Sequence, residues 1–250
     1  FREWVIIGIS GVTCGGKTTL ANKLQDTIAP VYVFHQDQYF YPDDSPKHVK
    51  CKNLDHNNYD ILSSLDMDQM YQDVLRTMAG EDRAQRSCAG AEGKFAIAGR
   101  KFLVLEGFTV LNYKPLLELC DFRYYLVLEY GECANRRCFR LYEPPDVAGY
   151  FEQCVWPEHL KYRAEVHTHP LHRHVTFACV RAPAPASRSV CTRPITTRVR
   201  SSPCPLIIVV TDGSLVLFHF VLRQAAGIGL QETRCFMELT CAWAFGFIIM

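Results

Sequence analysis

The chain contains no C-x-x-C pair, although it has 12 cysteines among its 250 residues. Disulfide scaffolds and zinc sites use cysteines at short, regular spacings, and the scaffolds are mostly small secreted domains. Cysteines scattered through a chain of this length indicate reduced thiols, so we expect a cytoplasmic protein. We also expect no signal peptide, because the first apolar run is short and is soon broken by glycine.

Lysine and acidic residues are scarce in the last third of the chain. The last lysine is Lys161, and no acidic residue lies between Glu165 and Asp212. Residues 1–168 hold 19 Lys and Arg against 23 Asp and Glu, whereas residues 169–250 hold 8 against 3, all 8 being Arg. The net charge of +1 therefore hides two parts of different composition. We expect no nucleic-acid partner. We also expect no membrane span, because Thr-Asp-Gly-Ser interrupts the apolar stretch that follows residue 205.

The most informative motif that is present lies near the amino end, where an apolar run leads into GVTCGGKTT, residues 11–19. Gly11, Gly16, Lys17 and Thr18 match the pattern G-x-x-x-x-G-K-[ST] of a phosphate-binding loop, in the required place after a strand. Glycines let the backbone amides turn inward around a polyphosphate, the lysine reaches the β and γ phosphates, and the threonine hydroxyl binds Mg²⁺. The loop residues predicted to hold the nucleotide are Gly11, Val12, Thr13, Cys14, Gly15, Gly16, Lys17, Thr18 and Thr19.

Short apolar runs alternate with helical patterns through the first two thirds of the chain. Strands are predicted at 4–9, 31–34, 101–105 and 124–128, helices at 17–29, 66–79, 116–119 and 132–140, a surface loop at 41–58, and a flexible excursion at 80–100. Such alternation predicts an α/β fold with a central parallel sheet of about five strands. Together with the phosphate loop it indicates the three-layer fold of P-loop NTPases, with a helical lid.

Two carboxylates follow predicted strands, and ligands bind at the carboxyl ends of strands in parallel sheets. Asp37 follows the second strand, and Glu106 ends the third. We predict that Asp37 accepts the proton of an attacking hydroxyl, and that Asp37, Glu106 and Thr18 hold Mg²⁺. From the residues alone, a turn cap at Asp37 and a solvated strand end at Glu106 remain open alternatives.

The predicted helix at 132–140 is rich in arginine. Arg136 and Arg140 are spaced i and i+4 and are expected to share one face, while Arg137 points elsewhere. Arginines on a lid can clamp a phosphoryl group during transfer. The alternative is an ordinary solvated helix face.

Several longer segments resemble nicotinamide riboside kinase. They are FHQDQYF at 34–40, the pair Tyr59-Asp60, LEGFTVLNYKPL at 105–116, ECANRRCFRLYEPPD at 132–146 and GYFEQCVWPEHLKYRAE at 149–165. The resemblance covers residues 1–166. It implies a kinase that uses ATP and Mg²⁺ to phosphorylate the ribose 5′-hydroxyl of nicotinamide riboside, giving nicotinamide mononucleotide for NAD synthesis.

The resemblance also implies residue roles. Asp37 and Lys17 would be catalytic, and Arg136 and Arg140 would face ATP. The residues implied to line the riboside pocket are Asp37, Tyr39, Phe40, Tyr59, Asp60, Arg137, Tyr142 and Glu143. An aromatic ring can stack on the pyridinium, and carboxylates suit its positive charge. Gln38 stands where this family has a second aspartate. The alternatives are a uridine or cytidine kinase, a binding protein that has lost turnover, and a defective isoform that does not fold.

Residues 167–250 depart from this family, which continues into a last strand, an Asp-Gly turn near the adenine and a closing helix. Here the chain is first rich in Arg, Pro and Cys and then apolar. One interpretation is that the stretch from 205 onward supplies the missing strand and its Asp-Gly turn. The other is that this part derives from an alternative exon and is disordered or only loosely attached. The sequence is therefore divided into a kinase domain at 1–166 and an atypical tail at 167–250.

Overall fold

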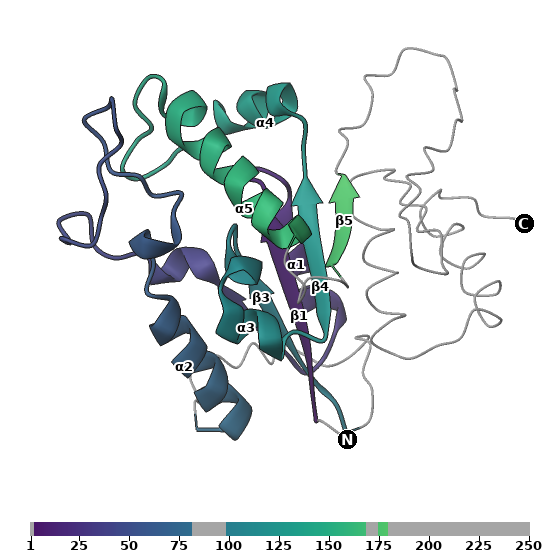
Figure 1. Ribbon diagram of the computed structural model, residues 1–250. Helices are drawn as coiled ribbons and strands as arrows, with labels where there is room; N and C mark the ends of the chain where they lie inside the picture. The colour runs from purple at the N-terminus through teal and green to yellow at the C-terminus, as the bar shows by residue number, and fades with distance from the viewer. Residues whose placement is uncertain (1–2, 82–98, 169–174, 180–250) are drawn as a thin grey trace, which may run out of the picture.

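The computed structural model describes residues 3–81, 99–168 and 175–179 (Figure 1). The strands are β1 (Trp4–Gly11), β2 (Val31–His35), β3 (Lys101–Glu106), β4 (Phe122–Val127) and β5 (Val175–Cys179). The α-helices are α1 (Lys17–Thr27), α2 (Met67–Ala79), α3 (Lys114–Leu119), α4 (Tyr130–Arg137) and α5 (Trp156–Thr168). Short turns of 3₁₀ helix lie at Gln36–Tyr39, Leu62–Ser64 and Val110–Asn112, and a π-helical turn, Phe151–Val155, leads into α5.

The five strands form one parallel sheet in the order β2-β3-β1-β4-β5. All eight residues of β1 are buried, as expected for a central strand covered on both faces. Alternate residues of that strand enter two different apolar clusters. Ile6 packs with α2, α3 and α5 on one face, and Ile7 packs with α1 on the other. The molecule is therefore a three-layer α/β/α sandwich, which confirms the predicted fold class.

The predicted strands and the first two predicted helices agree with the structure to within a few residues. The bounds expected for the helix at 132–140 were wrong. The helix α4 runs from Tyr130 to Arg137 and therefore ends three residues before Arg140. The helix α5 was not predicted, although the segment that contains it contributed to the resemblance. It begins with a π-helical turn, and Trp-Pro at its start obscures the periodicity. Most of the excursion expected at 80–100 lies outside the described residues.

The fifth strand lies at a different place from the one considered in the sequence analysis. β5 pairs with β4 from Arg123↔Val175 to Val127↔Cys179, within the stretch assigned to the atypical tail. Valine, threonine and phenylalanine favour a strand, but the run is only five residues long and its surroundings are rich in histidine, arginine and proline. The strand and Asp-Gly turn considered beyond residue 205 lie outside the described residues.

A third, smaller apolar cluster lies beyond the carboxyl ends of the strands. It joins the phosphate loop through Val12, the loop 41–58 through Cys51, α4 through Cys133, and the π-helical turn through Phe151 and neighbours. Figure 1 shows α4 beyond the arrowhead of β4, above the sheet. Among the helices that the structure describes, none is both long and apolar enough to cross a membrane.

Candidate active site

The phosphate loop is shaped by its backbone. Gly11 has φ +126°, and a Cβ there would lie 2.1 Å from the carbonyl oxygen of Leu126 in β4. Val12 N donates to that same carbonyl oxygen at 3.0 Å. Gly16 takes the left-handed conformation at the N-cap of α1, and Cys14 also has a positive φ of 57°. The neighbouring strand and α1 thus fix the loop, which has no room for a side chain at Gly11 and would strain one at Gly16.

Lysine and threonine of the motif face the loop and the end of β3, respectively. Lys17 is buried, and its Nζ donates to the carbonyl oxygen of Val12 at 2.8 Å, so its charge is held inside the loop. The Thr18 hydroxyl donates to Oε1 of Glu106 at 3.3 Å. The other oxygen of Glu106 lies 2.8 Å from Nδ1 of His35 at the end of β2. Glu106 is only 3% exposed, so the carboxylate is partnered on both oxygens rather than solvated.

Gln36 holds the turn that carries Asp37. Its buried side chain accepts a hydrogen bond from Thr109 N and donates to Thr109 Oγ1, so it joins the turn after β2 to the turn after β3. Gly107 is required beside it, because a Cβ at Gly107 would lie 2.3 Å from the Gln36 side chain. Asp37 therefore sits on a braced 3₁₀ turn, Gln36–Tyr39, at the carboxyl edge of the sheet.

Reduced hydration and the neighbouring charges together explain the raised pKa of Asp37. The Asp37 side chain retains solvent access, but the protein packed around it reduces its hydration and raises its pKa. The Glu106 charge raises the pKa further, while Lys17 and Arg140 act in the opposite direction. The hydrogen bond to Glu106 raises the pKa of His35 against the effect of burial. The charges of Asp37, Glu106 and Lys17 thus influence one another at this edge of the sheet.

This donor set fits Mg²⁺. The ion prefers oxygen ligands and is usually bound by one or two protein carboxylates plus phosphate and water. Thr18, Asp37 and Glu106 offer such oxygens, and the repulsion that raises the pKa of Asp37 is the kind a divalent cation relieves. Within residues 3–81, 99–168 and 175–179 no group of three or more His, Cys, Asp or Glu could hold a metal alone. The remaining ligands would have to come from a phosphate or water.

The lid, residues 130–146, covers the phosphate loop through Arg137. This arginine is buried and forms a bidentate ion pair with Asp146, with distances of 2.6 and 3.0 Å. Its third contact is a hydrogen bond to Thr13 Oγ1 at 3.1 Å. Burial has the largest single effect and lowers the pKa of Arg137, but the hydrogen bond to Asp146 and the nearby charges of Asp60 and Asp146 together raise it. The guanidinium also lies over the ring of Tyr142, 4.1 Å from its centroid.

The other two lid arginines do not share a helix face, which corrects the sequence analysis. Arg136 pairs with Glu132 at 2.6 Å and donates to the carbonyl oxygen of Cys14 at 3.3 Å. Arg140 lies beyond the end of α4, in the turn where its N donates to Arg137 O, and its guanidinium is 5.3 Å from the Tyr142 ring centroid. Arg140 reaches the site through this turn, near enough to lower the pKa of Asp37.

Aromatic and acidic side chains form the wall beside Asp37. The rings of Phe40 and Phe108 stack at 6.1 Å, and Tyr59 meets Phe40 edge-on. Tyr150 connects this wall to the π-helical turn, because its hydroxyl accepts from Tyr59 N and donates to Asp60 Oδ2, both at 2.9 Å. Burial raises the pKa of Asp60, and the Arg137 charge opposes that rise.

Two residues implied to line the riboside pocket contact other groups, and a third is exposed. Tyr39 donates its hydroxyl to Asp73 of α2 at 3.2 Å. The Tyr142 hydroxyl lies on the phosphate loop, 3.3 Å from Thr13 Oγ1 and 3.5 Å from Cys14 Sγ. Glu143 is exposed next to it. In this arrangement of the lid, Tyr142 covers the loop.

A family model described as the phosphoribulokinase / uridine kinase family matches residues 6–142 of the chain. The chain belongs to this family. Nicotinamide riboside kinase 1 of Rattus norvegicus is 40% identical over 166 residues, which are 65% of this chain and 80% of the relative. Nicotinamide riboside kinase 2 of Homo sapiens is 38% identical over 162 residues, covering 65% and 69%. The solved structure of a possible uridine kinase from Bacillus stearothermophilus is 17% identical with a TM-score of 0.36, covering 68% of this chain and 88% of that one.

These relatives confirm the resemblance stated from the sequence motifs. The chain is a nucleoside kinase, an ATP-dependent phosphotransferase whose acceptor is a hydroxyl group. The phosphate loop provides the nucleotide-binding element that this chemistry needs.

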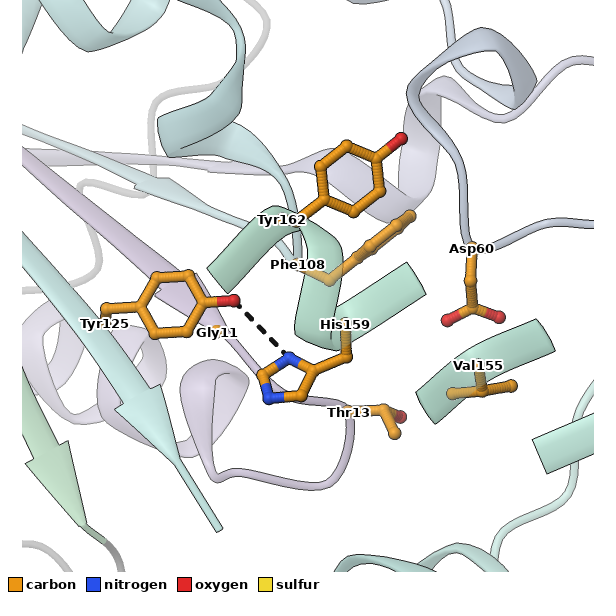
Figure 2. Close-up of a pocket in the computed structure, with 8 residues that line it drawn as sticks. All are labelled: Gly11, Thr13, Asp60, Phe108, Tyr125, Val155, His159 and Tyr162. Carbon is orange, nitrogen blue, oxygen red and sulfur yellow. Dashed lines mark hydrogen bonds between the residues drawn. The ribbon is translucent and has the colours of Figure 1, made fainter. Parts of the chain in front are cut away.

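Sequence reasoning missed several polar residues of this nucleoside kinase site. Figure 2 shows a pocket between the phosphate loop and α5, lined by Gly11, Thr13, Asp60, Phe108, Tyr125, Val155, His159 and Tyr162. His159 is buried, its Nδ1 lies 3.4 Å from the Tyr125 hydroxyl, and burial lowers its pKa to about 4. Asp146, Tyr150 and His35 were missed as well. No short motif marks them, because their roles depend on contacts with residues 9 to 90 positions away.

Proposed function

We propose that this nucleoside kinase transfers the γ-phosphoryl group of ATP to the 5′-hydroxyl of nicotinamide riboside, giving nicotinamide mononucleotide. The observation that carries the proposal is the position of Asp37, on a braced turn within the field of Lys17 and Glu106. The choice of riboside is supported by the 40% identity to nicotinamide riboside kinase 1 across 80% of that relative.

Asp37 is the proposed general base. A base must be deprotonated to accept the proton of the attacking hydroxyl, and the positive charges of Lys17 and Arg140 favour the carboxylate form against reduced hydration and the Glu106 charge. Lys17, the loop amides and the lid arginines Arg136 and Arg140 then stabilise the charge that develops on the transferring group. The reaction needs no covalent enzyme intermediate, because positioning and electrostatics provide the catalysis.

Mg²⁺ is the proposed cofactor, held by Thr18, Asp37 and Glu106 together with the nucleotide. When bound, it neutralises charge on the β and γ phosphates. On the protein side, the hydroxyl of Thr18 already donates to Glu106, so the two groups lie next to each other at the start of α1 and the end of β3.

The riboside is proposed to bind against the wall formed by Phe40, Tyr59 and Asp60. The aromatic rings offer faces for the cationic pyridinium, and the carboxylate of Asp60 can accept hydrogen bonds from ribose hydroxyls. Arg137, Tyr142, Glu143 and Tyr39 complete the proposed set. Since Tyr142 contacts the phosphate loop, the lid is proposed to move away from Thr13 when ATP enters.

A product assay on the full chain tests the proposal. Purified protein is incubated with ATP and Mg²⁺ and with nicotinamide riboside, uridine or cytidine at equal concentration, and nucleoside monophosphates are separated by chromatography. We expect kcat/KM for nicotinamide riboside to exceed that for either pyrimidine nucleoside at least ~10-fold. Faster turnover of uridine would assign a uridine-type kinase instead. ATP binding by calorimetry without any product would identify a binding protein that has lost turnover.

A further inference from the structure

Two thiols from distant parts of the chain meet beneath the proposed riboside wall. Cys51 Sγ and Cys154 Sγ are 2.7 Å apart and separated by 103 positions in sequence. Both are free and buried, 7% and 5% exposed. A disulfide bond is about 2.05 Å long, so a shift of well under 1 Å would bring the sulfurs to bonding distance.

The pair connects two segments that border the site. Cys51 belongs to the loop 41–58, where its N donates to the carbonyl oxygen of His56 at 2.9 Å and Lys50 bridges to Asn57. Cys154 lies in the π-helical turn, one residue before Val155 of the pocket in Figure 2. Both sulfurs belong to the small apolar cluster that also contains Val12 of the phosphate loop.

We propose that Cys51 and Cys154 are a redox-sensitive pair, which a peroxide converts to a disulfide that fastens the loop 41–58 to the π-helical turn. The other described thiols have different partners: Cys14 Sγ lies 3.5 Å from the Tyr142 hydroxyl, Cys120 Sγ donates to Leu116 O, Cys133 Sγ donates to Thr13 O, and Cys138 Sγ donates to Asn135 O. The disulfide depends on the meeting of these two thiols and not on the identity of the nucleoside.

The chemistry proceeds in two balanced steps. The Cys51 thiolate attacks one oxygen of hydrogen peroxide, the O–O bond breaks, and after protonation Cys51 is a sulfenic acid and one water has left. The sulfur of Cys154 then loses its proton and attacks the Cys51 sulfur, the S–O bond breaks, and a second water leaves. Two thiols are oxidised and one peroxide is reduced. Burial raises the pKa of Cys154 to about 12, so little of its thiolate is present at neutral pH and the closing step accelerates with pH.

The test treats the full chain with hydrogen peroxide at pH 8, blocks the remaining thiols with N-ethylmaleimide, and maps peptides by mass spectrometry. We expect a dithiothreitol-sensitive peptide pair joining Cys51 to Cys154, formed before any other crosslink. Because the bond closes a loop of about 100 residues, the Tm of the oxidised protein should rise by on the order of 5 °C or more.

Two variants separate this pair from the other cysteines. Cys154→Ser should abolish both the peptide pair and the Tm rise, and it should leave Cys51 as a sulfenic acid that dimedone labels. Cys138→Ser, at an exposed position whose Sγ donates to Asn135 O, should keep the peptide pair and the Tm rise. A Tm rise that persists in Cys154→Ser, or oxidised protein in which Cys51 and Cys154 join other cysteines or stay reduced, would overturn the proposal.

Discussion

The phosphate loop is held by backbone atoms, whereas the lid above it is held by side chains. Gly11 approaches Leu126 so closely that no Cβ fits, and Gly16 takes a left-handed conformation at the start of α1. The lid depends instead on the ion pairs of Arg137 with Asp146 and of Arg136 with Glu132. The phosphate loop therefore depends on glycine at particular positions, whereas the lid depends on pairs of charged side chains 4 and 9 positions apart.

The largest loss of stability is expected from adding one methyl group to the phosphate loop. Gly11→Ala places a Cβ 2.1 Å from a backbone oxygen at φ +126°, so it should lower the free energy of unfolding by more than ~3 kcal/mol or prevent folding. Thermal unfolding followed by circular dichroism measures the change.

Gly131→Ala is the matched control for this substitution. Gly131 lies in the first turn of α4, where an added methyl group would have no other atom within 4 Å, and alanine favours helix. Its stability should be unchanged or rise by up to ~1 kcal/mol. If Gly11→Ala were as stable as Gly131→Ala, the loop would not be fixed by its backbone.

The second prediction concerns the base at the edge of the sheet. Asp37→Asn keeps the size of the side chain but cannot accept the hydroxyl proton, so kcat should fall at least ~100-fold in a steady-state assay of product formation. Asp44→Asn, an exposed aspartate in the loop 41–58, should retain activity within about twofold. Near-normal turnover of Asp37→Asn would remove the assigned role, while equal losses in both variants would point to damage of the loop.

These two sites also mark how far the sequence could predict the structure. The loop, Asp37 and Glu106 could be predicted, because glycine spacing and the ends of apolar runs are local signals that a parallel sheet brings to one edge. The face shared by Arg136 and Arg140 was wrong, since periodicity did not reveal that α4 ends at Arg137. Asp146 and Tyr150 could not be predicted, because their roles arise from contacts 9 and about 90 positions away.

The third prediction uses His159, in the pocket between the phosphate loop and α5. Burial lowers its pKa to about 4 from 6.5, so the unfolded chain binds a proton more readily than the folded protein. This contribution to stability is present above pH 6.5 and is lost as pH falls toward 4. From pH 7 to pH 5 it should amount to about 2 kcal/mol.

Unfolding by urea at pH 7 and pH 5 measures this contribution. His159→Phe has no titrating group, so it should lose about 2 kcal/mol less than the wild type between the two pH values. His167→Phe, at an exposed position on the same helix, should change the difference much less. Identical pH dependence in the wild type and His159→Phe would show that His159 is not the titrating group.

The smallest effect is expected for the ion pair between Arg137 and Asp146, which holds the lid. A double-mutant cycle with Arg137→Gln and Asp146→Asn should give a coupling of about 1.5 kcal/mol in urea unfolding, because the pair is bidentate and Arg137 is buried. The same cycle on Lys50 and Asp55, an exposed pair at 3.4 Å, should give roughly 0.5 kcal/mol or less. Similar couplings in both cycles would mean that the apolar contacts of α4, rather than its ion pair, hold the lid over the loop.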